Sequence, residues 1–177
     1  RMADMYNALY QMSQPTIALV NGAAYGGGVG LVAACDFAIG GPKAQFCLSE
    51  VALGLVPAVI SPFVVEAIGV KAFKRYSMSG LSFSADDALR MGLLSHLVDD
   101  EALPQASAAV IAQLLRNGPA AMAVTKRLAT EVAYQSIGAD TKRHTSHLIA
   151  SLRGSAEGRE GIQAFLQKRP AAWHGDS

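Results

Sequence analysis

The chain has 177 residues, of which 51% are hydrophobic and only 16% are charged, well below the quarter typical of soluble domains. Its 15 Lys and Arg residues nearly balance its 14 Asp and Glu residues, for a net charge of +1. That balance argues against nucleic acid or an anionic membrane surface as a partner. The length fits one domain or slightly more, with enough chain to bury a core.

The charges are unevenly distributed, because residues 1–65 carry five of them and none lies between Met5 and Cys35. Polar residues and glycines interrupt that stretch, whereas a spanning helix needs about 20 mostly apolar residues in succession. No signal-peptide pattern is visible. Cys35 and Cys47 lack metal or redox spacing and are predicted to be small buried residues of a reducing compartment. We therefore expect a cytoplasmic protein with no membrane partner.

The first part of the chain alternates helices and strands. A helix is predicted over residues 2–12, followed after Pro15 by a short buried strand over 16–20. The glycine-rich segment 23–28 then leads into a buried helix over 29–35. Strands are predicted at 37–39 and 44–47, separated by a Gly-Pro-Lys turn.

After Pro57 helical patterns dominate. Helices are predicted over 58–68, 71–78, 85–91, 103–115, 120–136, 141–152 and 156–168, and one last strand over 94–98. Ser84 is expected to cap the helix over 85–91, with Asp87 three residues later in a capping-box arrangement. The pattern predicts an α/β fold over residues 1–100 and a helical region over 101–177.

The triplet Gly26-Gly27-Gly28 precedes a predicted helix. Backbone N–H groups at a helix start are unpaired, so such a loop suits a negatively charged oxygen. A dinucleotide-binding loop is an alternative, because Gly28 to Ala33 matches G-x-G-x-x-A. Against it, the triplet begins well after the strand that ends at Val20, and the later chain is mostly helical. A packed turn without a ligand remains the third possibility.

Glu50 is an isolated acid, one of only two glutamates before residue 86, and its neighbours are nearly all apolar. Burying an unpaired carboxylate is costly, so Glu50 is expected to be either paired or functional. The structural alternatives are an acid at a helix start or a partner for Lys71 or Arg75. His144 and His147 lie three apart on a helix without an evident carboxylate partner, so they are predicted to be surface imidazoles and no metal site is expected.

These motifs together resemble the crotonase family, the enoyl-CoA hydratases and isomerases. The resemblance rests on PTIALVNGAAYGGG from Pro15, the pair Cys35-Asp36, and Ala44-Gln45-Phe46 with Glu50. It continues through Ala67-Ile68-Gly69, Ser79-Gly80, 85–93 and 164–169. Residues 47–62 are most similar to bacterial hydratases of methylglutaconyl-CoA and related branched or carboxylated acyl-CoAs.

The resemblance implies a crotonase-like ββα spiral core, a helical C-terminal trimerisation region, and a fold whose N-terminal part lies outside this chain. It also implies that the Gly27 N–H donates to the thioester oxygen, that a loop outside this chain supplies the second donor, and that Glu50 is the general base and acid. Family hydratases usually carry a second glutamate, at the position that is Gly30 here. A second departure is Pro57-Ala58, where the family usually has Pro-Gly.

The expected function is therefore hydration of the C2–C3 double bond of an enoyl-CoA, in fatty-acid or branched-chain degradation. The alternatives are a Δ3-Δ2 enoyl-CoA isomerase with a single glutamate base, and a non-catalytic acyl-CoA-binding or scaffold protein. No cofactor is expected, since coenzyme A is part of the substrate, and the expected assembly is a homotrimer or a dimer of trimers. Beyond the catalytic Glu50 and Gly27, the predicted substrate-binding residues are Tyr25, Gly26, Gly28, Gly30, Pro57, Phe165 and Lys168.

Overall fold

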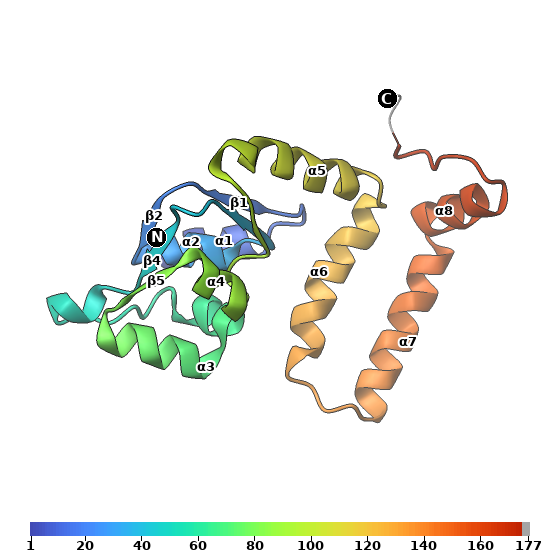
Figure 1. Cartoon of the computed structure of the whole chain (residues 1–177). Coiled ribbons are helices and arrows are strands. Elements are labelled where there is room, and N and C mark those ends of the chain that lie inside the picture. Colours follow the sequence, from blue (N-terminus) through green and yellow to red (C-terminus); the bar gives the residue numbers. More distant parts are fainter. Residues whose placement is uncertain (175–177) are drawn as a thin grey trace. The chain divides into compact units, whose positions relative to one another are not determined.

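The computed structural model describes residues 1–174, and no helix within them is long and apolar enough to cross a membrane. The chain forms two compact units (Figure 1). Residues 1–12 and 16–110 make the first, and residues 13–15 with the chain from Ile111 onward make the second. The roles predicted for residues 1–100 and 101–177, an active-site core and a trimerisation region, stay predictions.

The first unit contains the strands and the second is helical. In chain order the first unit holds α1 (Met2–Tyr10), β1 (Ile17–Val20), β2 (Ala23–Tyr25), α2 (Gly27–Ala34), β3 (Phe37–Gly40), β4 (Gln45–Cys47), the 3-10 turn η1 (Glu50–Leu53), α3 (Ser61–Ser79), β5 (Ser82–Ser84), α4 (Ala85–Met91), β6 (His96–Leu97) and the 3-10 turn η2 (Asp100–Ala102). The elements that follow are α5 (Leu103–Leu115), α6 (Pro119–Ala133), α7 (Ala139–Gly154) and α8 (Ala156–Leu166).

Most predicted elements are confirmed within a few residues, with two differences that matter for the site. The prediction missed the short strands β2 and β5, and it began a helix at Ala58 where α3 starts only at Ser61. The predicted break near Gly69 is present, because this residue adopts φ 76° and ψ 161° inside α3. The capping box of α4 is confirmed, with Asp87 N–H donating to Ser84 Oγ at 3.1 Å and Ser84 N–H donating to Asp87 Oδ2 at 3.4 Å.

The strands form two small sheets. One has the order β1-β3-β6 and is parallel throughout; the other has the order β2-β4-β5. In the second sheet β4 pairs in parallel with β2 and antiparallel with β5. The β2–β4 register aligns Tyr25 with Cys47, so the segments that follow these two strands begin side by side.

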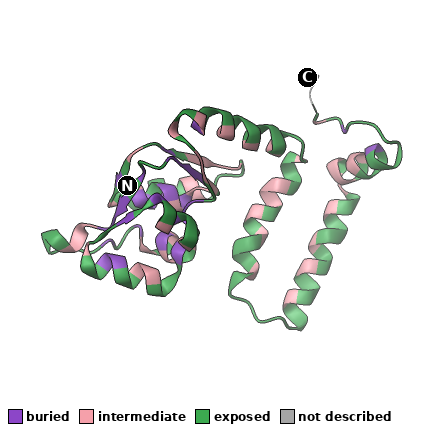
Figure 2. Cartoon of the chain, in the orientation of Figure 1, coloured by how far each residue is buried: buried purple, intermediate pink, exposed green. Residues whose placement is uncertain are grey.

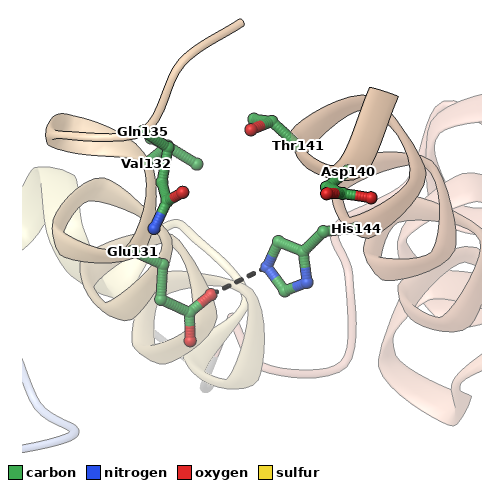
Figure 3. Close-up of a pocket in the computed structure, with 6 residues that line it drawn as sticks. All are labelled: Glu131, Val132, Gln135, Asp140, Thr141 and His144. Atoms are coloured by element: carbon green, nitrogen blue, oxygen red, sulfur yellow. Dashed lines mark hydrogen bonds and ion pairs between the residues drawn. The ribbon is translucent and has the colours of Figure 1, made fainter. Parts of the chain in front are cut away.

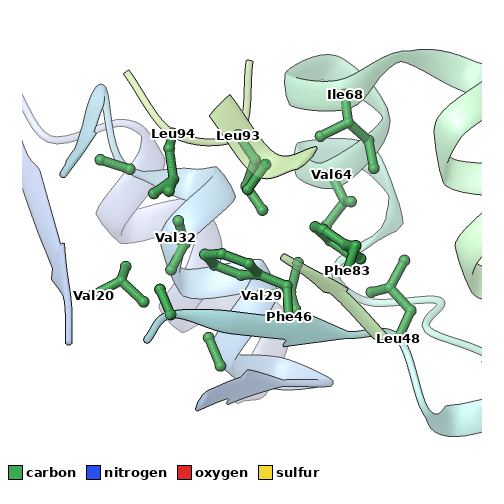
Figure 4. Close-up of a cluster of buried hydrophobic side chains, with 14 of the residues drawn as sticks. Val20, Val29, Val32, Phe46, Leu48, Val64, Ile68, Phe83, Leu93 and Leu94 are labelled. Carbon is green, nitrogen blue, oxygen red and sulfur yellow. The ribbon is translucent and has the colours of Figure 1, made fainter. Parts of the chain in front are cut away.

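A buried apolar core lies between these sheets and the helices around them (Figures 2 and 4). Phe46 on β4 stacks on Phe83 of β5 with ring centroids 5.4 Å apart, and Tyr76 packs on Phe83 at 4.4 Å. Cys47 is buried as predicted, whereas Cys35 is only half-buried. Such aromatic contacts contribute beyond the area that they bury, and they hold β4, which precedes Glu50, in place.

The helix α2 owes its existence to packing, because three glycines in eight residues disfavour a helix by about 1 kcal/mol each relative to alanine. Val29 and Val32 of α2 are buried in the core. Gly30 is buried too, and a Cβ atom added there would lie 2.2 Å from Ile60 Cγ2 and 3.1 Å from Tyr6 Cε1. The space beside Gly30 is therefore already occupied.

Carboxylates connect the segments of the second unit. Glu157 of α8 accepts hydrogen bonds from the N–H groups of Ala120 and Ala121 at 2.9 and 2.8 Å, and so caps the start of α6. Glu160 accepts two hydrogen bonds from Arg169, at 2.7 and 3.0 Å, and one from the Ala172 N–H at 2.9 Å. These bonds lower the pKa of Glu160 from its ordinary 4.5 to about 2.

Replacing Gly30 with alanine is expected to lower the free energy of unfolding by about 1–3 kcal/mol, because the new methyl group overlaps the side chain of Ile60. The double variant Gly30→Ala/Ile60→Ala should lose less stability than the sum of the losses measured for Gly30→Ala and Ile60→Ala separately. The reason is that the new methyl group fills part of the cavity left at Ile60. Gly28→Ala is the matched control: its Cβ would meet only Ala24 Cβ, at an ordinary 3.6 Å. Urea unfolding of the four variants measures these differences. Strict additivity would contradict the described packing.

Glu160→Gln is expected to destabilise the protein at neutral pH and to make less difference in acid. The folded-state pKa of Glu160 is about 2, below its ordinary value of 4.5. Its stabilisation is therefore complete above about pH 4.5 and is lost as the pH falls towards 2. Thermal unfolding of the wild type and the variant at several pH values between 7 and 2.5 measures the change. A difference in unfolding temperature that is independent of pH would exclude this ion pair as its cause.

Candidate active site

The glycine triplet continues directly from β2. The Gly26 N–H donates to the Cys47 carbonyl at 2.8 Å, which extends the β2–β4 pairing by one bond. Gly26 then adopts φ 50° and ψ −115°, a backbone conformation that strongly favours glycine, and α2 begins at Gly27. The glycines do lie well after the strand that ends at Val20, but the short strand β2, which the prediction missed, comes between that strand and the triplet.

Two backbone donors at the start of α2 have no acceptor among the residues that the structure describes. The N–H groups of Val29 and Gly30 donate to the Gly26 carbonyl at 3.0 and 3.4 Å. Within residues 1–174, the N–H groups of Gly27 and Gly28 find no protein acceptor. Gly27 is exposed and Gly28 half-buried. An exposed, unpaired N–H at a helix N-terminus is suited to a partly negative oxygen.

Glu50 lies beside this loop. The parallel pairing of β2 with β4 brings the residues after Cys47 close to Gly26, and Glu50 opens the turn η1 there. Its Oε1 lies 3.2 Å from the position that a Cβ on Gly26 would occupy, which is a second reason for glycine at this position. Its Oε2 is buried and has no hydrogen-bond partner among the described residues. A half-buried carboxylate with an unsatisfied oxygen thus sits next to the unpaired N–H groups.

Of the two structural alternatives for Glu50, a position at a helix start and an ion pair with Lys71 or Arg75, only the first is observed in the described residues. Glu50 does occupy the first turn of a short helix, η1. Within the described residues it forms no ion pair with Lys71 or Arg75, and the Arg75 guanidinium lies instead over the Tyr76 ring, 5.1 Å from its centroid. An acid left unpaired in a half-buried position costs stability, so this one is a strong functional candidate.

The other predicted site residues of the first unit differ in exposure. Tyr25 is exposed and its hydroxyl donates to Gln45 Oε1 at 3.5 Å. Gly30, at the position of the family's second glutamate, is buried under Ile60 and Tyr6. Pro57 is buried in a loop whose other apolar side chains are mostly exposed: Leu53 at 76%, Leu55 at 60% and Val56 at 70%.

Phe165 and Lys168 lie at the end of α8 in the second unit. The Phe165 side chain is 81% exposed. Lys168 adopts φ 53°, the left-handed conformation that glycine usually takes after a helix. Its N–H donates to the Phe165 carbonyl and the Arg169 N–H to the Ala164 carbonyl, both at 3.1 Å, which is the Schellman pattern. The predicted coenzyme A contacts of these two residues stay predictions.

Sequence reasoning missed Tyr6 and Ile60. Both are almost fully buried, at 2% and 4% exposure, and both contact α2 at its glycines. The Tyr6 hydroxyl donates to the Gly27 carbonyl at 2.9 Å. The only available signal was the general one that a buried tyrosine hydroxyl finds a hydrogen-bond partner; it does not say which partner.

A cavity of about 370 Å³ opens between α6 and α7 in the second unit (Figure 3). None of the predicted site residues lines it; its lining consists of Glu131, Val132, Gln135, Asp140, Thr141 and His144. The prediction that His144 lacks a carboxylate partner was wrong, because its Nε2 lies 2.9 Å from Glu131 Oε2. Among the described residues, no group of three or more potential ligands is placed to hold a metal ion.

The dinucleotide alternative finds no support in the sheet. A dinucleotide-binding unit needs strands that alternate with helices in one mostly parallel sheet. Here β4, the strand before Glu50, has an antiparallel neighbour in β5, and β3 belongs to the other sheet.

Comparison with known proteins identifies the family of this chain. The family model described as enoyl-CoA hydratase/isomerase matches residues 1–176. A carnitinyl-CoA dehydratase of Citrobacter koseri is 30% identical over 94% of this chain and 66% of its own length. Two solved structures are similar over nearly the whole length of this chain. An enoyl-CoA hydratase from Shewanella pealeana has a TM-score of 0.94 and 43% identity, covering 97% of this chain and 64% of that one. An enoyl-CoA hydratase/isomerase from Marinobacter aquaeolei has 0.92 and 33%, covering 98% and 66%.

The chain spans 65–66% of the length of the curated relatives that it matches first. Over that span the expected crotonase-like fold is confirmed by the similarity to solved structures. The family match over nearly every residue, together with relatives at 30% identity and above, decides the assignment. This chain belongs to the enoyl-CoA hydratase/isomerase family.

Proposed function

We propose that the protein containing this chain is an enoyl-CoA hydratase in which Glu50 is the general base and acid. The observation that carries the proposal is the position of the Glu50 carboxylate. It lies beside the exposed start of α2, with one oxygen unsatisfied and the Gly27 N–H unpaired nearby. A base and an oxyanion donor in one place are the two groups that addition of water to an enoyl thioester requires.

The unpaired N–H of Gly27 serves the thioester oxygen. When water adds at C3, the electrons of the C2–C3 double bond move towards the thioester and give its oxygen the charge of an enolate. A backbone N–H held in place before the reaction stabilises that charge without reorganising. Coenzyme A belongs to the substrate, and the reaction requires no separate cofactor.

A single carboxylate can complete the cycle. Glu50 takes one proton from the water as the water oxygen bonds to C3, and the protonated carboxyl then returns a proton to C2. The second carboxylate common in the family has no counterpart at Gly30, and Ile60 and Tyr6 fill the space where its side chain would begin. The packing beside Gly30 thus supports a mechanism with one carboxylate.

A Δ3-Δ2 enoyl-CoA isomerase is the alternative that this packing favours. An isomerase moves one proton from C4 to C2 through the same enolate, and one base is enough for that. The names of similar proteins favour the hydratase, since a hydratase and a dehydratase add or remove water. A third alternative is a member of the family that binds acyl-CoA without turnover.

The acyl group and the assembly are further parts of the proposal. Similarity of residues 47–62 to methylglutaconyl-CoA hydratases supports a branched or carboxylated acyl chain. Large apolar side chains exposed in the second unit support a homotrimer or a dimer of trimers, since burying apolar surface against a partner is favourable. These side chains are Ile111, Leu115, Tyr134, Ile137, Ile149, Ile162, Phe165 and Leu166.

Glu50→Gln is expected to lower kcat for hydration of crotonyl-CoA or methylglutaconyl-CoA by about 10²–10⁴-fold, because the amide cannot accept the proton from water. Glu66→Gln is the matched control: Glu66 is an exposed glutamate of α3 that accepts the Tyr10 hydroxyl, and its loss should leave turnover unchanged. The loss of the conjugated thioester absorbance measures the rate. Full activity of Glu50→Gln would exclude the mechanism.

Product analysis separates the alternatives. A 3-enoyl-CoA that becomes conjugated, with no hydrated product from crotonyl-CoA, would identify an isomerase. Binding of crotonyl-CoA in calorimetry without turnover of any enoyl-CoA would identify a non-catalytic member of the family.

A further inference from the structure

Three consecutive peptide units of the glycine loop are each held by a hydrogen bond. The unit ending in the Gly26 N–H is held by the Cys47 carbonyl at 2.8 Å. The next contains the Gly26 carbonyl and the Gly27 N–H, and its carbonyl accepts from Val29 and Gly30. The third contains the Gly27 carbonyl and the Gly28 N–H, and its carbonyl accepts the Tyr6 hydroxyl at 2.9 Å.

These bonds matter because glycine has the largest conformational freedom of all residues. In a planar trans peptide the C=O and N–H groups point in opposite directions. A bond to each carbonyl therefore also fixes the direction in which the N–H of the same unit points. Of the three bonds, only the one from Tyr6 comes from a side chain, so it alone can be removed by a substitution that leaves the backbone intact.

Tyr6 is itself firmly held. It is 2% exposed, and its ring lies against Phe63 with centroids 6.0 Å apart. Its hydroxyl lies 2.8 Å from the position that a Cβ on Gly27 would occupy, and its Cε1 lies 3.1 Å from the corresponding position at Gly30. The phenol thus spans the first turn of α2, against the two glycines where the family's chemistry is expected.

We propose that Tyr6 is the positioning residue of the oxyanion loop. Its hydroxyl holds the Gly27–Gly28 peptide unit, and the bonds to the Gly26 carbonyl hold the unit before it. Together they fix the backbone at Gly27, whose N–H is the proposed donor to the thioester oxygen. This inference rests on the proposed acyl-CoA chemistry, and Tyr6 acts through the loop without touching the substrate.

Tyr6→Phe tests the proposal, because it removes the hydroxyl and keeps the ring. Tyr10→Phe is the matched control: Tyr10 lies one turn later on α1, also packs on Phe63, at 5.3 Å, and donates to Glu66 instead of to the loop. We expect Tyr6→Phe to lower kcat for crotonyl-CoA roughly 10- to 100-fold with little change in KM. This is less than the loss of 10²–10³ typical when an oxyanion donor is removed outright. The control should retain wild-type kcat, while both variants lose a similar amount of thermal stability.

Hydrogen exchange of the peptides that cover residues 24–30, followed by mass spectrometry, supplies a readout that does not depend on turnover. Exchange there should be faster in Tyr6→Phe than in the wild type and unchanged in Tyr10→Phe. If exchange is faster in Tyr6→Phe but the wild-type protein turns over no enoyl-CoA, the result would count against the proposed function and support the role of Tyr6 in the loop. Unchanged exchange, or a kcat equal to that of Tyr10→Phe, would overturn the positioning role.

Discussion

The bare glycine face at the start of α2 is the constraint on which the rest of the site depends. Because Gly26, Gly27 and Gly30 carry no side chains, Glu50, Tyr6 and Ile60 approach the backbone of the helix directly. Any β-carbon at these positions would meet one of those three side chains at 3.2 Å or less. The same glycines weaken the helix, so the buried valines of α2 have to hold it against the core. Close packing on one side and unpaired N–H groups at the helix start are thus two results of one sequence feature.

Much of the fold could be predicted from sequence because most of its elements are long or strongly patterned. The helices after Pro57, the capping box of Ser84 and the break at Gly69 all leave local signals. The strands β2 and β5 leave almost none, since each has three residues and the first is Ala-Ala-Tyr. Their existence depends on pairing with β4, which is distant in sequence and is held by the stacking of Phe46 on Phe83.

Some residues of the candidate site could likewise be predicted from sequence, and others could not. Glu50 could be singled out because an isolated acid among apolar residues is unusual. Gly27 could be singled out because a cluster of glycines at a helix start is also unusual. Tyr6 and Ile60 could not, because their importance comes from contacts with glycines 21 and 30 residues away along the chain. The same holds for the Glu131–His144 pair, whose members lie on different helices. The two departures from the family, Gly30 and the segment after Pro57, looked unrelated in sequence. In the structure Ile60, three residues beyond Pro57, fills the space that Gly30 leaves.

We propose that the start of α2 presents a preorganised N–H donor to a thioester oxygen next to a single carboxylate. The most direct measurement is the infrared carbonyl stretch of crotonyl-CoA, labelled with ¹³C at the thioester carbonyl, bound to the Glu50→Gln variant. A donor held in place polarises the carbonyl, so the account predicts a stretching frequency below that of the same thioester in water. A frequency equal to or above the value in water would contradict it.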